Sequence, residues 1–343
     1  MTNTPTNHPT VATGRIGVLL VNLGTPDAPT PKAVKRYLQE FLSDRRVIEL
    51  PAFLWQIILR GIVLQTRPAR SAKLYAKVWD NERSGSPLAL NTTDQANALK
   101  DTWGPNVIVA HAMRYGNPTI RDAIDRMRTQ GVERLLIAPL YPQYSAATTA
   151  SVMDAVAAHM GRLRWQPAVR TLPPYYDDPA YIGALAGSVR AHLKALGWQP
   201  DTILASFHGM PRVTLTKGDP YHCHCAKTAR LLSEELGDVA SKMTHSFQSR
   251  FGAQQWLAPY SIDKVAELAK QGVRKLVVIA PGFSSDCLET LEEIQLGLSE
   301  AFRHHGGTDF SYVPCLNATA PGIELLDQLI GRELLGWTAP ARR

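Results

Sequence analysis

The residues best suited to chemistry lie in one short stretch, APGFSSDCLETLEEI, from residue 280 to residue 294. It follows the apolar run KLVVIAP and carries Asp286, Glu289, Glu292 and Glu293. Helix capping alone accounts for part of this pattern, because Asp286 is a good N-cap and Glu289 follows at the capping-box spacing. On an α-helix Glu289 and Glu293 would also share one face. Two such carboxylates could bind a hard cation or carry protons.

A second candidate is the histidine of the segment SFHGMP, residues 206–211. His208 closes an apolar run, and its imidazole suits a base or a metal ligand at neutral pH. The alternative is a core histidine with both ring nitrogens hydrogen bonded. Ser206 could act as a hydrolase nucleophile, but no G-x-S-x-G motif accompanies it.

The segment HCHC, residues 222–225, contains metal-binding residue types. It lacks the distant second pair that zinc sites use. We therefore interpret it as part of a helix that begins near Cys225, with histidines facing solvent.

The composition is that of a globular enzyme: 343 residues, 45% hydrophobic and 20% charged, with a net charge of +7. Lys and Arg are scattered, and no nucleic-acid motif occurs, so we expect no nucleic-acid partner. The sequence contains neither of the glycine-rich phosphate-binding motifs G-x-G-x-x-G and G-x-x-x-x-G-K-[ST]. Their absence argues against a nucleotide cofactor. Residues 1–14 lack the pattern of a secretory signal and are predicted to be a disordered tail. These features favour a cytoplasmic protein with reduced cysteines.

The most apolar segment runs from Leu50 to Lys73 and is interrupted by Gln56 and Arg60. It is too broken for a membrane span of about 20 residues. One interpretation is an ordinary amphipathic core helix. The other is an apolar lip beside a pocket, which could make transient contact with a membrane surface.

Parts of the sequence occur twice in the same order. GVLLVNLGTP, AMRYG and QGVERLLIAPLYPQYS in the first half are echoed by TILASFHGMP, QSRFG and QGVRKLVVIAPGFSSD in the second. Each copy alternates apolar strands with helical patterns, which is typical of parallel sheets. We predict an α/β fold of two similar Rossmann-like, doubly wound lobes with a cleft between them.

The predicted boundaries follow from this repeat. The first lobe covers residues 15–172 and includes the lip at 50–73, and the second covers residues 173–332. Residues 333–343 are predicted to be a C-terminal tail. Ligands of such sheets bind beyond the carboxyl ends of the strands. His208 and the acidic stretch should therefore open onto one cleft, where capping and site roles are compatible.

The chain resembles the ferrochelatases, which insert ferrous iron into a porphyrin. The resemblance runs from about residue 15 to residue 332 and is carried by seven motifs: LLVNLGTPDAPTPKAVKRYLQEFLSDRRVIELP, RYGNPTI, LYPQYSAATT, SFHGMP, GDPYHCHCAKTARLL, SRFGAQQWLAPY and APGFSSDCLETLEEI. It implies catalytic roles for His208 and Glu289, and metal ligation by these two residues and Glu293. It further implies that the porphyrin is bound by Arg114, Tyr115, Tyr141, Trp256, Asp286, Tyr75 and Ser86.

The resemblance implies the last step of haem synthesis, in which protoporphyrin IX takes up Fe²⁺ and releases two protons. The alternatives are a chelatase for coproporphyrin or for cobalt, and a non-catalytic haem- or porphyrin-binding protein. We expect no cofactor beyond the iron substrate. A [2Fe–2S] cluster, present in some relatives, is not expected because the last residues contain no cysteine. We expect a monomer in the cytoplasm. The alternative location is the surface of the inner membrane, which the protein would contact transiently through residues 50–73.

Overall fold

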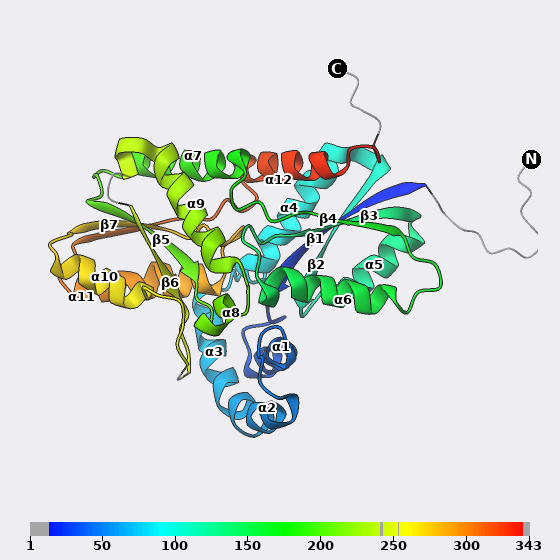
Figure 1. The fold of residues 1–343 in the computed structure, drawn as a ribbon, viewed down its shortest axis with the longest axis horizontal. Coiled ribbons are helices and arrows are strands. Elements are labelled where there is room, and N and C mark those ends of the chain that lie inside the picture. Colours follow the sequence, from blue (N-terminus) through cyan, green and yellow to red (C-terminus); the bar gives the residue numbers. More distant parts are fainter. Residues whose placement is uncertain (1–13, 241–242, 253, 339–343) are drawn as a thin grey trace, which may run out of the picture.

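Each half of the chain forms a four-stranded parallel sheet in this computed structural model, which describes residues 14–240, 243–252 and 254–338. The two lobes lie side by side, and a helical projection extends outward from the region where they meet (Figure 1). The strands are β1 (Arg15–Gly24), β2 (Val107–Tyr115), β3 (Val132–Pro139) and β4 (Ala168–Thr171) in the first lobe, and β5 (Thr202–His208), β6 (Thr244–Gln248), β7 (Lys275–Ile279) and β8 (Asp309–Val313) in the second.

The two sheets have the same strand order, which confirms the predicted pair of similar α/β lobes. The first sheet runs β2-β1-β3-β4 and the second runs β6-β5-β7-β8. In the central strands, Leu19 pairs with Ala110 and Ile137, and Leu204 pairs with Thr244 and Val278. These strands are apolar along their length because helices cover both faces of the sheet.

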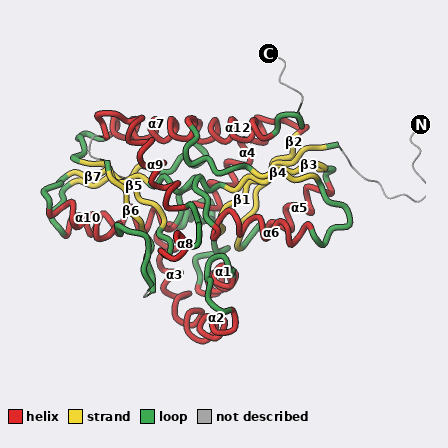
Figure 2. Tube along the Cα trace, in the orientation of Figure 1, coloured by secondary structure: helices red, strands yellow, loops and turns green. Residues whose placement is uncertain are grey.

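Helices flank both sheets, as the red and yellow tubes of Figure 2 show. The α-helices are α1 (Pro31–Ser43), α2 (Ala52–Ile58), α3 (Leu64–Val78), α4 (Pro87–Trp103), α5 (Ile120–Thr129), α6 (Ser151–Met160), α7 (Pro179–Ala195), α8 (Arg212–Thr216), α9 (Tyr221–Leu236), α10 (Ser261–Lys270), α11 (Ser299–His304) and α12 (Ala320–Glu333). Two short 3₁₀ helices are η2 (Gly104–Asn106) and η4 (Gly237–Ala240). Three π-helical segments are η1 (Leu59–Val63), η3 (Ala146–Ala150) and η5 (Glu289–Leu298).

The π-helical segments η3 and η5 occupy matching places in the two lobes. Each follows the third strand of its lobe, η3 after β3 and η5 after β7. π-helical turns are rare and are frequent at functional sites. The repeat therefore includes the irregular helix that leads away from the predicted ligand edge of each sheet.

The helix that follows the last strand of each sheet packs against elements of the other sheet's lobe. Helix α7 follows β4 of the first lobe but contacts α9 and β8 of the second, where His192 bonds Ser311 Oγ at 2.8 Å. Helix α12 follows β8 but contacts α4 of the first lobe. The two helices lie end to end along one side of the molecule (Figure 1). Arg170 of β4 donates to the carbonyls of Glu333 and Leu335 at 2.6 and 2.9 Å, which fastens the end of α12 to the first lobe. The predicted tail at 333–343 thus begins with residues that contact the first lobe, while residues 339–343 and 1–13 lie outside the described residues.

The predicted lip at residues 50–73 comprises α2, η1 and the first part of α3, and together with α1 it forms the helical projection. Its apolar side chains are exposed, with Phe53 at 76%, Ile57 at 59% and Ile62 at 61%. On the inner side, Trp55 Nε1 donates to the Leu42 carbonyl at 2.6 Å and ties α2 to α1. Among the described residues, no helix has the length and apolar character needed to cross a bilayer.

Candidate active site

The acidic stretch that follows β7 forms a π-helix instead of the α-helix expected from the sequence. η5 begins at Glu289, and its N-cap residue Leu288 makes no side-chain capping bond, so the capping prediction for Asp286 is wrong. Hydrogen bonds from i to i+5 widen the helical turn, so residues four and five apart share a face. Glu289 and Glu293 stay on one side. Glu292 pairs with Lys77 Nζ of α3 at 2.9 Å.

Asp286 is buried and holds the loop before η5 in place. Its carboxylate accepts hydrogen bonds from Thr290 Oγ1 at 2.9 Å and Tyr312 O–H at 2.7 Å. Asn317 Nδ2 donates to the second carboxylate oxygen at 2.6 Å. These bonds connect η5 to β8 and to the loop that follows it. In this structure Asp286 orients the acidic helix, and its role as a porphyrin contact stays a prediction.

Glu293 links the acidic helix to the end of β6. Its carboxylate accepts from the backbone N–H of Ser249 at 2.7 Å and from the Ser249 hydroxyl. Ser249 adopts a positive φ of 66°, a conformation uncommon outside glycine, which turns both donors toward the carboxylate. Burial raises the pKa of Glu293; the Ser249 bonds and the imidazole of His208 oppose that rise, and Glu289 adds to it. Glu293 is thus bonded to the end of β6, the strand that pairs with the His208 end of β5.

His208 ends β5 with its ring held by one hydrogen bond. Nδ1 lies 2.7 Å from the carbonyl oxygen of Gly209. Because a carbonyl only accepts, Nδ1 carries a proton, and in the neutral ring the lone pair is then on Nε2. The Tyr221 hydroxyl donates to the His208 carbonyl at 2.9 Å and fixes the strand end. The arrangement leaves Nε2 as the basic atom of the ring.

Glu289 begins η5 beside the helical projection, because the preceding residue Leu288 packs in the same apolar cluster as Tyr37 and Tyr75. Burial raises the pKa values of Tyr37 in α1 and Tyr75 in α3, and the carboxylate of Glu289 adds to both shifts. Its backbone carbonyl accepts from Gln248 Nε2 at 2.9 Å, which ties η5 to β6. Tyr75, predicted to contact the porphyrin, is therefore close to Glu289. Residues of the first lobe and the acidic helix of the second meet at this point.

Ser206 is a structural residue. Its hydroxyl donates to Gln248 Oε1 at 2.6 Å and lies 2.9 Å from Ser261 Oγ, fully buried between β5 and β6. The disfavoured hydrolase interpretation gains no support, because this hydroxyl is committed to Gln248, which in turn positions the backbone of Glu289.

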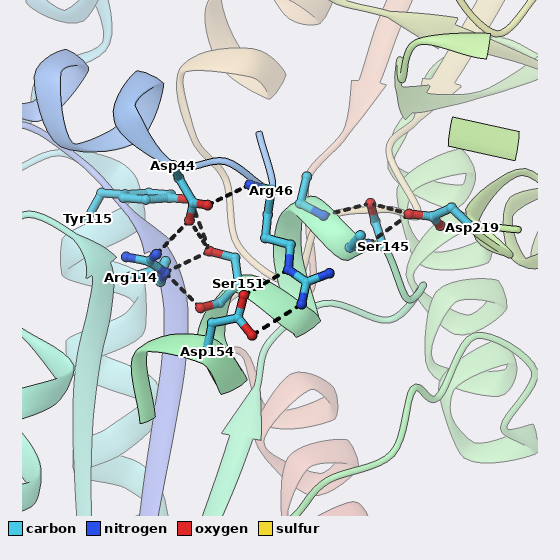
Figure 3. Close-up of polar contacts among 10 residues, drawn as sticks. Asp44, Arg46, Arg114, Tyr115, Ser145, Ser151, Asp154 and Asp219 are labelled. Carbon is cyan, nitrogen blue, oxygen red and sulfur yellow. Dashed lines mark hydrogen bonds and ion pairs between the residues drawn. The ribbon is translucent and has the colours of Figure 1, made fainter. Parts of the chain in front are cut away.

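Arg114 and Tyr115 lie at the carboxyl end of β2 in a buried polar network (Figure 3). Both donate to the same carboxylate oxygen of Asp44, Arg114 Nη2 at 2.5 Å and the Tyr115 hydroxyl at 2.8 Å. Arg114 Nε also reaches Ser151 Oγ at 2.7 Å, and Ser151 Oγ donates to Asp44 at 2.5 Å. Sequence reasoning missed Asp44 and Ser151. Asp44 lies in the motif FLSDRR without any distinguishing pattern.

The other residues predicted to bind the porphyrin lie on several different elements of the two lobes. Tyr141 follows β3, and its buried hydroxyl has no hydrogen-bond partner within the described residues. Buried polar groups are normally satisfied, so this hydroxyl marks a place where a ligand or water would bind. Trp256 is buried beside Gly209 and donates to the Phe251 carbonyl at 2.9 Å. Ser86 caps α4 by accepting from the Ala89 N–H at 3.2 Å.

The described residues contain no group of three His, Cys, Asp or Glu side chains positioned to hold a metal ion. His208, Glu289 and Glu293 therefore do not form a closed metal cage in this structure. In the HCHC segment the helix starts at Tyr221, earlier than predicted. The solvent-facing interpretation is wrong for His224, which stacks on Tyr176 at 3.6 Å and accepts from the Tyr144 N–H at 3.2 Å.

A surface hollow of about 830 Å³ lies elsewhere, between α4, α7 and α12. Trp103, Asp178 and Arg332 are among its lining residues, and none of the predicted site residues lines it. The helical projection reaches the second lobe through the ion pairs Lys77–Glu292 and Glu49–Lys217. These contacts hold the first lobe's projection against the second lobe.

Comparisons with known proteins agree with this geometry. The ferrochelatase family model matches residues 15–334. A protein named ferrochelatase from Agrobacterium fabrum (strain C58 / ATCC 33970) is 52% identical over 337 residues, covering 97% of each chain. The ferrochelatase of Rhizobium meliloti (strain 1021) is 51% identical, covering 97% of this chain and 98% of the relative. Among solved structures, SirB from Bacillus subtilis with Fe³⁺ superimposes with a TM-score of 0.55 at 11% identity, covering 94% of this chain and 96% of that one. That likeness concerns the fold.

Proposed function

The chain belongs to the ferrochelatase family and inserts iron into a porphyrin for haem synthesis, and we propose that His208, Glu289 and Glu293 carry out this step. The observation that supports the proposal is that the end of β6 links all three groups: Gln248 pairs with His208 in the sheet and donates to the Glu289 carbonyl, and Ser249 donates to the Glu293 carboxylate. We propose ferrous iron and protoporphyrin IX as the substrates.

The chemistry requires that two pyrrole protons leave while the iron loses its water. Nε2 of His208 has a free lone pair and can take a pyrrole proton or bind the iron transiently. Carboxylate oxygens replace the water of a hard cation. Glu289 and Glu293 on one face of η5 would receive the ion in steps. An open set of ligands suits this task, because the metal has to be released into the porphyrin.

The environment of Glu293 suits it to proton transfer. Its pKa is raised by burial, and two carboxylates in range of each other share protons more readily than isolated ones. Glu293 would accept a proton from the ring side and release it toward solvent. Arg114, Tyr115, Tyr141, Trp256, Asp286, Tyr75 and Ser86 are the proposed binding residues for the porphyrin.

Iron insertion by point variants tests the assignment. His208→Ala should abolish insertion under anaerobic conditions, followed as loss of protoporphyrin fluorescence, while the variant still binds porphyrin. Glu289→Gln should lower kcat by about 10²-fold, the lower range for a lost acid–base group. His245→Ala, on the neighbouring strand β6, is the matched control. Normal turnover by the His208 variant would remove this residue from the mechanism.

Substrate identity is tested with the same assay. Protoporphyrin should give a higher kcat/KM than coproporphyrin, and Fe²⁺ a higher value than Co²⁺. The reverse order in either pair would assign the other substrate. The proposal includes no [2Fe–2S] cluster, which analysis of acid-labile sulfide in anaerobically purified protein checks.

We further propose that the lip makes transient contact with a membrane surface and that the protein is a monomer. Phe53, Ile57 and Ile62 expose apolar surface, and Arg60 lies in the same projection. Flotation with anionic vesicles should recover wild-type protein, and Phe53→Ser combined with Ile57→Ser should reduce recovery. Equal recovery of both proteins would refute the membrane contact. Sedimentation velocity without lipid tests the monomer.

A further inference from the structure

One face of α9 in the second lobe holds the loop that follows β3 in the first lobe. Gln143 Nε2 donates to Thr228 Oγ1 at 3.1 Å, and the Tyr144 backbone N–H donates to His224 Nδ1 at 3.2 Å. His224 and Thr228 are four residues apart on α9 and therefore lie on the same face of the helix. The loop leaves β3 at the carboxyl end of the strand, the edge of a parallel sheet where ligands bind.

Asp219, in the loop before α9, binds the next two residues of the same segment. Its carboxylate accepts from the Ser145 hydroxyl at 3.2 Å (Figure 3) and from the Ala146 N–H at 2.8 Å. Ser145 is also the N-cap residue of η3. Four consecutive residues, 143–146, thus form hydrogen bonds with the second lobe. The position of this loop in the first lobe therefore depends on the second lobe.

The hydrogen bond from Tyr144 defines the protonation state of His224. The imidazole stacks on the ring of Tyr176, in the loop before α7, with centroids 3.6 Å apart and planes 7° from parallel. A backbone N–H only donates, so Nδ1 of His224 accepts, and the ring is neutral with its proton on Nε2. A second proton would go to Nδ1 and point at the Tyr144 N–H. Because two donors cannot bond each other, protonation would break this contact.

The groups that act on the imidazole come from three segments. Burial lowers the pKa of His224, the carboxylates of Asp177 and Asp219 oppose the fall, and Lys227 of α9 adds to it. Lys227 also forms an ion pair with Asp177 at 2.6 Å, which offsets the charge of both. The ring of Tyr176 covers one face of the imidazole. His224 is therefore neutral at pH 7 and takes up its proton below its ordinary value of about 6.5.

We propose that His224 is a positioning residue whose neutral ring holds the loop after β3 against the second lobe, and whose protonation releases that loop. Asp219 and Thr228 keep their bonds when this happens, so the loop loosens at Tyr144 while the lobes stay together. Tyr141 lies in the same loop. The effect on turnover rests on the proposed function of Tyr141 as a porphyrin-binding residue, whereas the contact itself does not.

Hydrogen exchange of a peptide covering residues 140–150 measures the release without substrate. Protection, corrected for the intrinsic pH dependence of exchange, is compared at about pH 5 and about pH 7.5, on either side of the ordinary histidine pKa. In wild type it should fall about three- to tenfold at the lower pH, the range for one hydrogen bond. His224→Asn offers an amide oxygen near the place of Nδ1 that does not titrate, so its protection should not change with pH. His224→Phe keeps a ring against Tyr176 without an acceptor, so its protection should be low at both pH values.

Iron insertion provides the second readout. The KM for porphyrin should rise at the lower pH in wild type relative to His224→Asn. His222→Asn is the matched control and should follow wild type, because His222 lies on the same helix but stacks on Phe247 of β6.

The same pH dependence of protection in wild type and His224→Asn would overturn the inference. This comparison alone decides it if His224→Phe does not fold. A loss of protection in acid without a change in KM would support the His224 contact and refute the proposed role of Tyr141, so the two failures are distinguishable.

Discussion

Replacing Ser249 by alanine should shift the pH dependence of iron insertion. The Ser249 hydroxyl donates to Glu293, and this bond works against the rise in pKa that burial causes. A hydrogen bond to a charged group contributes about 1.5–3 kcal/mol. Since one pKa unit corresponds to about 1.4 kcal/mol, loss of the lower figure raises the pKa of Glu293 by about one further unit.

The assay is the pH profile of kcat/KM for iron insertion. The acid limb of Ser249→Ala should lie about one pH unit above that of wild type. Ser246→Ala is the matched control, because its hydroxyl bonds Ser261 at 2.8 Å and does not contact the acidic helix. An acid limb that stays in place, or moves to lower pH, would refute the link between Ser249 and the carboxylate.

The raised pKa of Glu293 also makes the free energy of unfolding depend on pH. The pKa of Glu293 is raised in the folded protein, so its contribution to stability is fully present below the unfolded pKa of about 4.3 and is lost as pH rises through the folded pKa. Glu293→Gln should therefore raise the free energy of unfolding at neutral pH while it lowers turnover. Urea denaturation of wild type and Glu293→Gln at acid and neutral pH measures the change in stability, and the iron-insertion assay measures the change in turnover.

Three further predictions concern residues that hold the candidate site in place. Asp286→Ala should lower the free energy of unfolding by about 3 kcal/mol in urea denaturation, because it leaves Tyr312 and other buried donors unpaired. Gly209→Ala should reduce turnover more than stability, since its Cβ would lie 2.5 Å from the Gln248 carbonyl and displace the end of β5; a variant with normal kcat would contradict this. Burial opposes ionisation of Asp44, yet its hydrogen bonds lower its pKa, so its stabilisation is present above the unfolded pKa and lost as pH falls through the folded pKa. Asp44→Asn should flatten the acid side of the stability curve measured by thermal unfolding.

The fold could be predicted from sequence because its signal is local and repeated. Two sets of apolar strands in the same order, each followed by a helix, allow few arrangements other than two parallel sheets. The echo between residues 130–145 and 271–286 placed β3 and β7 in matching positions, and the structure confirms the match. The packing of α7 and α12 against the lobe of the other sheet could not be predicted from the sequence, because an amphipathic helix does not specify which apolar surface it covers.

The site was predicted less completely than the fold. His208 and the acidic helix could be found from their residue types at strand ends. The π-helical form of η5 could not, because acids at spacings of three and four fit an α-helix equally well. Asp44 was missed because its partners Arg114 and Ser151 lie 70 and 107 residues away, and only tertiary structure turns an ordinary loop aspartate into a buried carboxylate.

The exchange of terminal helices has a consequence for how the chain is made. The helix α12 is synthesised after both sheets, yet it covers α4, which emerged more than two hundred residues earlier. Leu99 of α4 and Leu329 of α12 belong to the same apolar core as Phe207 of the second sheet. The N-terminal half therefore leaves the ribosome with an uncovered apolar face, which α12 covers only after the second sheet has been synthesised. A nascent chain arrested near residue 200 should then be an open, protease-sensitive intermediate and not a finished domain awaiting its twin.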